Sequence, residues 1–323
     1  MDLHSTLQGY ALQLKNTPRT LLGVAGVVQK IMKTLYATHF PNAEDRRPGR
    51  NPECPDSDIL TLAWLLEYIG ADSEHSGYQR LKVELQTLFP CLPERSRFNR
   101  RRRNLSETAS EVLRQALRTY VPKTDVFIVD SFPMPICDFK RAKSSKSELK
   151  WADASGTLAT YGHCATKGLG TFFGFRGHLM TTDAGVPVDF AIASGHIDDR
   201  EVLGVLSQGG RYPIVLGDKG YVSHALQQEL RDAENMCLLP TLRSNQKSQY
   251  PEVFRQLHGR IRRRIETTLN QLTQQFSVGR VRARTHWGVQ TRMSNKFGAC
   301  LLGVFLNQVL GRPLMKLKDL VLA

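Results

Sequence analysis

Two aspartates occupy positions where a carboxylate could take part in metal-assisted chemistry. Asp130 follows the apolar run Val126–Val129, and Asp218 follows the apolar run Pro213–Gly217. Short apolar runs predict buried strands, and open α/β sheets bind ligands beyond the carboxyl ends of their strands. One such aspartate could equally be a turn or cap residue, but two on neighbouring strands would bring their carboxylates together. Close carboxylates repel each other unless a cation or proton intervenes, and oxygen ligands favour Mg²⁺ or Mn²⁺.

A third acid, Glu266, lies in a segment whose apolar spacing predicts a helix over residues 258–276. It lies about 100° from Ile265, at the edge of the apolar stripe, and can face a sheet without entering the core. An ion pair with Arg262, four residues earlier, is the structural alternative. Only two acids occur in residues 255–323, and an isolated acid on a basic, DNA-facing helix favours a functional role.

Three carboxylates suit a site for two divalent cations, Mg²⁺ or Mn²⁺, and phosphoryl transfer. One ion would activate an attacking water or 3′-hydroxyl, and the other would stabilise the leaving oxygen. Three further acids compete as ligands, namely Asp198, Asp199 and Glu201. Their pattern resembles a capping box, so a role at the start of a helix is the favoured interpretation for all three.

Composition excludes several classes of protein. The chain has 323 residues, 41% of them hydrophobic, which predicts a sizeable core and about two domains. This rules out a disordered tail, a collagen-like repeat and a disulfide scaffold. Neither a membrane span nor a signal peptide is visible, and the six cysteines are scattered. We therefore expect a reduced, cytoplasmic protein without a membrane partner.

The net charge of +14 predicts a nucleic-acid partner and is unevenly spread. Residues 255–323 carry 13 basic and 2 acidic residues, and residues 93–105 hold six arginines. Arginine forks suit phosphate oxygens, although a basic run can also be a solvated surface. The side chains that we expect at the DNA are Arg97, Arg100, Arg101, Arg102, Arg103, Lys140, Arg141, Lys219, Arg262, Arg263, Asn270, Arg282 and Arg284.

The elements that must position these residues follow from periodicity. Helical spacing of apolar residues, without a paired strand, occurs in the segments 1–35, 59–69, 78–89 and 106–119. From residue 124 the predicted order is strand, hairpin, helix, strand, helix, strand, helix, with residues 131–170 as a long connection. That order is typical of an α/β fold with a mixed sheet and helices on its faces. The predicted domains are a helical DNA-binding domain (1–122), a catalytic core (123–278) and a basic C-terminal extension (279–323).

Several motifs together resemble the DDE transposases with an RNase H-like catalytic core, and more narrowly the transposases of IS982-family insertion sequences. VDSFPM contains Asp130, GDKGY contains Asp218, and IETTLNQL contains Glu266. The resemblance assigns these acids, in that order, as the catalytic metal ligands. It implies cleavage at the terminal inverted repeats of a bacterial insertion sequence, joining of the 3′-hydroxyl to target DNA, and a homodimer on DNA associated with the nucleoid.

One feature departs from related transposases, many of which carry a Y-(2)-R-(3)-E-(6)-K pattern. Arg262 and Glu266 match it, but Gly259 and Thr273 occupy the Tyr and Lys positions. DNA contacts from this helix must then come from other residues. Two alternatives stay open: a structure-selective nuclease of the same fold without strand transfer, and a non-catalytic DNA-binding derivative.

Overall fold

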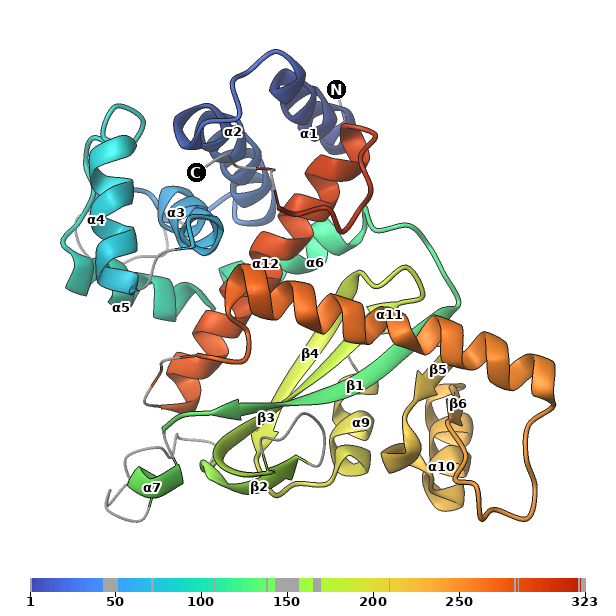
Figure 1. The fold of residues 1–323 in the computed structure, drawn as a ribbon. Coiled ribbons are helices and arrows are strands. Elements are labelled where there is room, and N and C mark those ends of the chain that lie inside the picture. The colour runs from blue at the N-terminus through green and yellow to red at the C-terminus, as the bar shows by residue number, and fades with distance from the viewer. Residues whose placement is uncertain are drawn as a thin grey trace. The chain divides into compact units, whose positions relative to one another are not determined.

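The chain forms two compact units in a computed structural model (Figure 1). One unit comprises residues 1–121 and 291–323, and the other comprises residues 122–290. The structure describes residues 2–42, 52–70, 73–106, 108–137, 139–142, 157–164, 170–208, 210–281, 283, 285–318 and 320. Within these ranges, no helix combines the length and the apolar character that crossing a membrane requires.

The first unit is helical, as predicted. It contains α1 (Leu3–Leu12), a 3₁₀ turn η1 (Gln13–Lys15), α2 (Leu21–His39), α3 (Asp56–Tyr68), α4 (Glu74–Glu84), α5 (Arg95–Ser106) and α6 (Ala109–Arg118). Thr20 caps α2 by accepting a hydrogen bond from the Gly23 N–H, and Ser73 and Ser76 form a capping box on α4. Helix α3 is the most deeply buried of these, because both its apolar and several of its polar side chains lie in the core.

The last helix, α12 (His286–Val309), contributes to this unit from residue 291 onward. Lys296 Nζ lies 2.6 Å from Glu67 Oε2, and the Tyr68 hydroxyl donates to the Ala299 carbonyl at 2.7 Å. The predicted division differs from this arrangement, since residues 279–323 do not form a separate extension. The reason is that α12 is largely apolar and buries its side chains against α3, which the charge count of the segment concealed.

The second unit is built on one mixed sheet. Its strands are β1 (Val126–Pro135), β2 (Thr160–Cys164), β3 (Gly170–Thr182), β4 (Pro187–Ser194), β5 (Ile214–Gly217) and β6 (Cys237–Pro240). The order is β2-β3-β1-β5-β6, and β4 also pairs with β3. Strand β3 pairs in antiparallel with β1, β2 and β4, whereas β5 pairs in parallel with both β1 and β6. This topology confirms the predicted RNase H-like α/β core.

The predicted long connection over residues 131–170 is wrong at both ends. Strand β1 continues to Pro135, α7 covers Phe139–Ala142, and β2 begins at Thr160. The cause is β3, whose 13 residues give the extended part of β1 a backbone partner. Beyond Ile128 that part pairs, among the residues that the structure describes, only with β3, so prolines without an N–H are tolerated on its other side.

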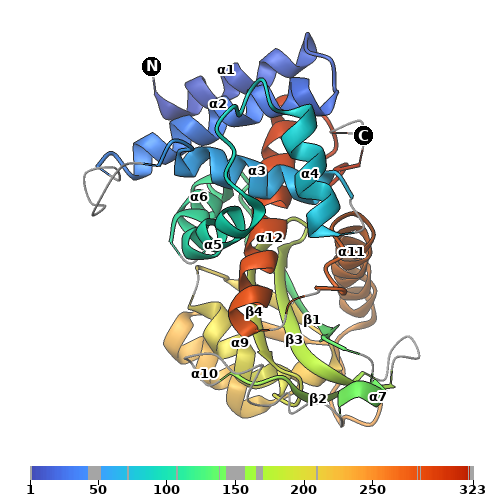
Figure 2. The same ribbon diagram turned by 90° about the vertical axis from the view of Figure 1, so that its left-hand side faces the viewer.

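Helices cover both faces of this sheet. Helix α11 (Glu252–Phe276) lies on one face, while α9 (Asp199–Ser207) and α10 (His224–Glu234) lie on the other (Figure 2). Ile265 of α11 packs against Ile128 of β1 and Leu216 of β5 in a buried cluster. This contact fixes α11 across the two central strands, close to Asp130 and Asp218.

Candidate catalytic site

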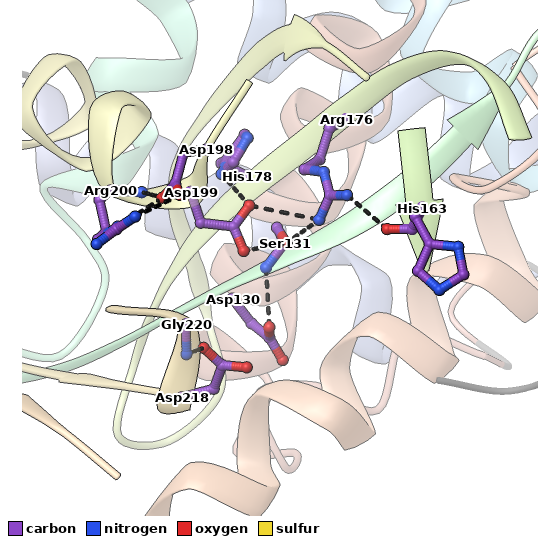
Figure 3. Close-up of polar contacts among 10 residues, drawn as sticks. All are labelled: Asp130, Ser131, His163, Arg176, His178, Asp198, Asp199, Arg200, Asp218 and Gly220. Atoms are coloured by element: carbon purple, nitrogen blue, oxygen red, sulfur yellow. Dashed lines mark hydrogen bonds and ion pairs between the residues drawn. The ribbon is translucent and has the colours of Figure 1, made fainter. Parts of the chain in front are cut away.

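Asp130 and Asp218 come together as the sequence predicts. Strands β1 and β5 are parallel, with Ile128 opposite Leu216, so the two aspartates follow two residues later in the same register. Their carboxylates face each other (Figure 3). Asp130 lies in the middle of β1 rather than beyond its end, which corrects the prediction. The effect is the same, because β5 ends at Gly217 and leaves this stretch of β1 open on that side.

Backbone N–H groups orient both carboxylates. The Ser131 N–H donates to Asp130 Oδ1 at 2.9 Å. The Gly220 N–H donates to Asp218 Oδ1 at 2.7 Å, and this bond caps the 3₁₀ turn η3 (Lys219–Tyr221) that follows β5. Each of these hydrogen bonds uses one carboxylate oxygen of its aspartate, Oδ1.

The pair concentrates negative charge in a partly buried place. Burial, and then the charge of Asp218, raise the pKa of Asp130 to about 7. The Arg262 guanidinium acts in the opposite direction, since its Nη1 lies 3.7 Å from Asp130 Oδ2. Near neutral pH the carboxyl group of Asp130 is thus divided between its protonated and ionised forms.

Glu266 stands apart from the two aspartates. It lies one turn beyond Arg262 on α11, its side chain is 51% exposed, and Arg262 Nη2 donates to its Oε1 at 3.0 Å. The ion pair that we considered as a structural alternative is therefore formed. Arg262 contacts both Asp130 and Glu266 and so occupies the position between them.

The fit to a divalent cation rests on the aspartate pair. Two facing carboxylates, whose charge Arg262 offsets only in part, are a suitable oxygen donor set for Mg²⁺ or Mn²⁺. Among the residues that the structure describes, no group of three His, Cys, Asp or Glu side chains is arranged to hold a metal ion. Asp130 and Asp218 fit the ion, and the set of three that includes Glu266 is not assembled.

Asp199 lies beside Asp130, whereas the sequence interpretation favoured a capping role for it and for Asp198 and Glu201. Asp198 alone makes the cap of α9, by accepting from the Arg200 N–H at 2.9 Å. Asp199 instead points toward β1, where the Ser131 hydroxyl donates to its Oδ2 at 3.0 Å (Figure 3). The signal was available, because two adjacent acids at a helix start cannot both make the same capping bond.

A basic pocket of about 370 Å³ adjoins Asp218. Its walls come from the ends of β5 and β6, the segment that follows β6, and α11. Three side chains that we expected at DNA line it, namely Lys219, Arg262 and Arg263, and Arg255 and Tyr250 join them. The pocket thus combines a candidate catalytic carboxylate with four cationic side chains, which suits a phosphodiester better than a neutral ligand.

The arginine run of residues 93–105 divides into two groups. Arg97 and Arg100 are exposed on α5. Arg102 is 5% exposed and its Nη2 lies 3.0 Å from Glu74 Oε2. Arg101 is only partly exposed, and its Nη2 lies 2.5 Å from the buried carboxylate of Asp56. For Arg101 and Arg102 the structure therefore differs from our expectation, because both guanidinium groups already satisfy buried carboxylates.

The other residues expected at DNA are scattered. Lys140 is exposed on α7, Asn270 is exposed on α11, and Arg103 is partly buried on α5. Arg282, Arg284 and the side chain of Arg141 lie outside what the structure describes.

Comparison with known proteins identifies the family of the chain. The sequence profile of the family described as "Transposase DDE domain" matches residues 121–286, just over half of the chain. The chain belongs to this family. No curated protein matches it. Among solved structures, a remote similarity is to the "Crystal structure of the Mos1 mariner paired end complex with Mn", with 11% identity and a TM-score of 0.23, covering 86% of this chain and 87% of that chain. A likeness at that level carries no argument about this chain.

Proposed function

We propose that this protein is a metal-dependent DNA transposase that cleaves the ends of an insertion sequence and joins the freed 3′-hydroxyl to target DNA. The observation that carries the proposal is the aspartate pair, Asp130 and Asp218, at the edge of an RNase H-like sheet beside a cationic pocket. Membership of the transposase DDE domain family supports the same chemistry.

The proposal includes two divalent cations, Mg²⁺ or Mn²⁺, with Asp130 and Asp218 as ligands and Glu266 as the third carboxylate. When bound there, such ions supply activation of the attacking oxygen and stabilisation of the leaving oxygen. Glu266 is exposed and held only by a single-turn ion pair. An exposed pair of this kind contributes a fraction of a kcal/mol to about 1 kcal/mol, so releasing Glu266 from Arg262 costs little.

The cationic residues would hold the DNA strand in line with the carboxylates. Lys219 follows Asp218 directly and lines the pocket with Arg262 and Arg263. Guanidinium and ammonium groups at such positions neutralise phosphate charge and orient the scissile bond. Arg262, which faces Asp130, is placed to exchange its carboxylate partners for a phosphate when DNA enters.

The finer parts of the proposal rest on the sequence motifs. VDSFPM, GDKGY and IETTLNQL occur in the order of IS982-family transposases. We therefore propose the terminal inverted repeats of such an element as the DNA substrate, a homodimer that brings two ends together, and action at the bacterial nucleoid in the cytoplasm.

The test is cleavage of DNA that carries the sequences flanking the gene. We expect Mg²⁺-dependent nicking at the element end by the wild type and its absence in Asp130→Ala, Asp218→Ala and Glu266→Ala. Asp232→Ala is a matched control, because Asp232 is exposed on α10, and it should cleave normally. DNA binding, measured with Ca²⁺ in place of Mg²⁺, should survive in all four variants.

Each alternative predicts a different outcome. A pre-cut end that is not joined to plasmid DNA, although uncut DNA is cleaved, would indicate a nuclease of the same fold. DNA binding without cleavage in Mg²⁺ or Mn²⁺ would indicate a non-catalytic derivative. Full activity in any one of the three acid variants would remove that residue from the site.

A further inference from the structure

A hydrogen-bonded network adjoins the aspartate pair on the side away from α11. Asp199 receives a hydrogen bond from the Ser131 hydroxyl at 3.0 Å, and Arg176 Nη1 lies 3.5 Å from its other oxygen. Arg176 is itself held, because its Nη2 donates to the His163 carbonyl at 2.8 Å. Figure 3 shows these side chains in a continuous line from β3 through Asp199 to β1.

Ser131 connects this network to Asp130. Its hydroxyl donates to Asp199, while its backbone N–H donates to Asp130 Oδ1 at 2.9 Å. Displacement of Ser131 would therefore move the bond that orients Asp130. Asp199 helps to hold this position by accepting from the Ser131 hydroxyl, to which Arg176 Nη1 also donates at 3.4 Å.

Asp199 and Asp218 also border one small space. A Cβ atom on Gly220 would lie 2.9 Å from Asp218 Oδ1 and 3.7 Å from Asp199 Oδ2. Only a residue without a side chain leaves this space open. Two carboxylates of like charge facing the same opening disfavour one another unless a cation or its bound water lies between them.

Two buried polar groups beside these carboxylates have no hydrogen-bond partner among the described residues. The Tyr221 hydroxyl is one, and its ring is fully buried within electrostatic reach of all three aspartates. The other is the His178 imidazole, which is 1% exposed and whose Nδ1 lies 3.9 Å from Asp199 Oδ1. Buried donors without partners are uncommon in native proteins, and they indicate that a ligand or water normally completes the site.

We propose that Asp199 is a positioning residue of the metal site, which holds Ser131 and thereby Asp130 and adds a third negative charge across Gly220 from Asp218. This inference rests on the proposed function, because it assigns Asp199 a role toward the cation that the aspartate pair would bind. Asp199 acts through its neighbours and is not itself assigned as a metal ligand.

A purely structural role does not account for Asp199. The cap of α9 is made by its neighbour Asp198, which also forms an ion pair with Arg200 at 2.7 Å. The side chain of Asp199 is only 18% exposed, and its cationic neighbour Arg176 lies at a loose 3.5 Å. Removing that charge would relieve repulsion in the protein without a cation, so fold stability alone does not favour an aspartate here.

The test measures Mn²⁺ affinity of the full chain by titration calorimetry, without DNA. Asp199→Asn should weaken Mn²⁺ binding by roughly 10–100-fold, the range for groups that orient metal ligands. Asp198→Asn, a neighbouring acid on the same helix start, should bind Mn²⁺ as the wild type does. The unfolding temperature of Asp199→Asn without metal should be unchanged or higher, which separates loss of positioning from loss of folding.

A second pair of variants tests the connection through Ser131. Ser131→Ala removes the hydroxyl that donates a hydrogen bond to Asp199, and it should also weaken Mn²⁺ binding. Ser131→Thr keeps a hydroxyl and should retain most of the wild-type Mn²⁺ affinity. If Asp199→Asn failed to fold, this pair would decide the question. Equal Mn²⁺ affinity in Ser131→Ala and the wild type would then overturn the inference.

Asp130→Asn separates this inference from the function on which it rests. We expect it to abolish measurable Mn²⁺ binding. If it does so while Asp199→Asn binds Mn²⁺ like the wild type, Asp199 has no positioning role and the proposed function stands. If Asp130→Asn binds Mn²⁺ unchanged, the proposed metal site itself is wrong.

Discussion

Buried charges are arranged differently in the two units. In the helical unit two partly buried carboxylates each meet a cation: Glu74 lies 3.0 Å from Arg102 and 2.6 Å from Arg292, and Glu67 lies 2.6 Å from Lys296. In the α/β unit Asp130 and Asp218 meet each other, and Arg262 approaches Asp130 only to 3.7 Å. Cations therefore balance the negative charge in the helical unit, whereas negative charge is in excess at the aspartate pair of the α/β unit.

The pKa values express this difference. Burial acts to raise the pKa of Glu74, but Arg102 and Arg292 outweigh it and lower the pKa below its usual value. At Asp130 burial and Asp218 together outweigh Arg262, and the pKa rises to about 7. A buried charge that stabilises the fold is paired with an opposite charge. A buried charge that serves to bind a ligand destabilises the fold until the ligand is bound. The two carboxylates should therefore respond to removal with opposite signs.

The largest effect is expected from Glu74→Ala. It leaves two arginines without their carboxylate, one of them 5% exposed, and breaking a buried pair in this way costs about 3–5 kcal/mol. Because the pKa of Glu74 is lowered in the folded protein, its stabilisation is present above the unfolded pKa and is lost as the pH falls. Chemical denaturation at pH 7 measures the loss. Glu84→Ala, which removes an exposed partner of Arg80, should change stability by less than about 1 kcal/mol. An equal loss in both variants would contradict the comparison.

A smaller effect of opposite sign is expected from Asp130→Asn. The raised pKa of Asp130 means that its favourable contribution is present below the unfolded pKa, near 4, and is lost as the pH rises through about 7. Without metal, the variant should be more stable than the wild type by up to about 4 kcal/mol at pH 8 and equal to it near pH 4, since each unit of pKa shift corresponds to about 1.4 kcal/mol. Thermal unfolding in a chelator at the two pH values measures this. Destabilisation at pH 8 would show that the aspartate pair is not strained.

The smallest effect concerns DNA and divides the arginine run of α5. Arg97 and Arg100 are exposed, whereas Arg101 and Arg102 are engaged in ion pairs. Arg97→Ala and Arg100→Ala should leave folding intact, weaken DNA binding a few-fold, and each reduce the salt dependence of binding by about one ion. Arg80→Ala, which replaces a partly exposed arginine on α4, is the control. Unchanged binding in both α5 variants would exclude this helix from the DNA contact.

Local pattern predicted the elements well where burial and periodicity agree. The hairpin over residues 171–193, the strand before Asp218 and the helix that carries Glu266 all appear in the structure. The extension of β1 to Pro135 could not be predicted, because proline and polar residues give no strand signal and the partner strand lies more than 35 residues away. The ion pairs that the arginine run forms with Asp56 and Glu74 could not be predicted either, because they depend on how the helices pack.

By itself, the sequence determined which carboxylates would meet. Two apolar strands that pair in parallel bring Asp130 and Asp218 side by side, and apolar spacing turns the Glu266 helix toward the same strands. Only the tertiary structure decided that Arg262 stands between Asp130 and Glu266, and that Asp199 turns inward while Asp198 caps its helix. The alternation of side chains along a strand and the period of a helix are local properties that repeat along the chain. The partner of a charge, however, depends on distances of a few ångströms between segments that only folding brings together.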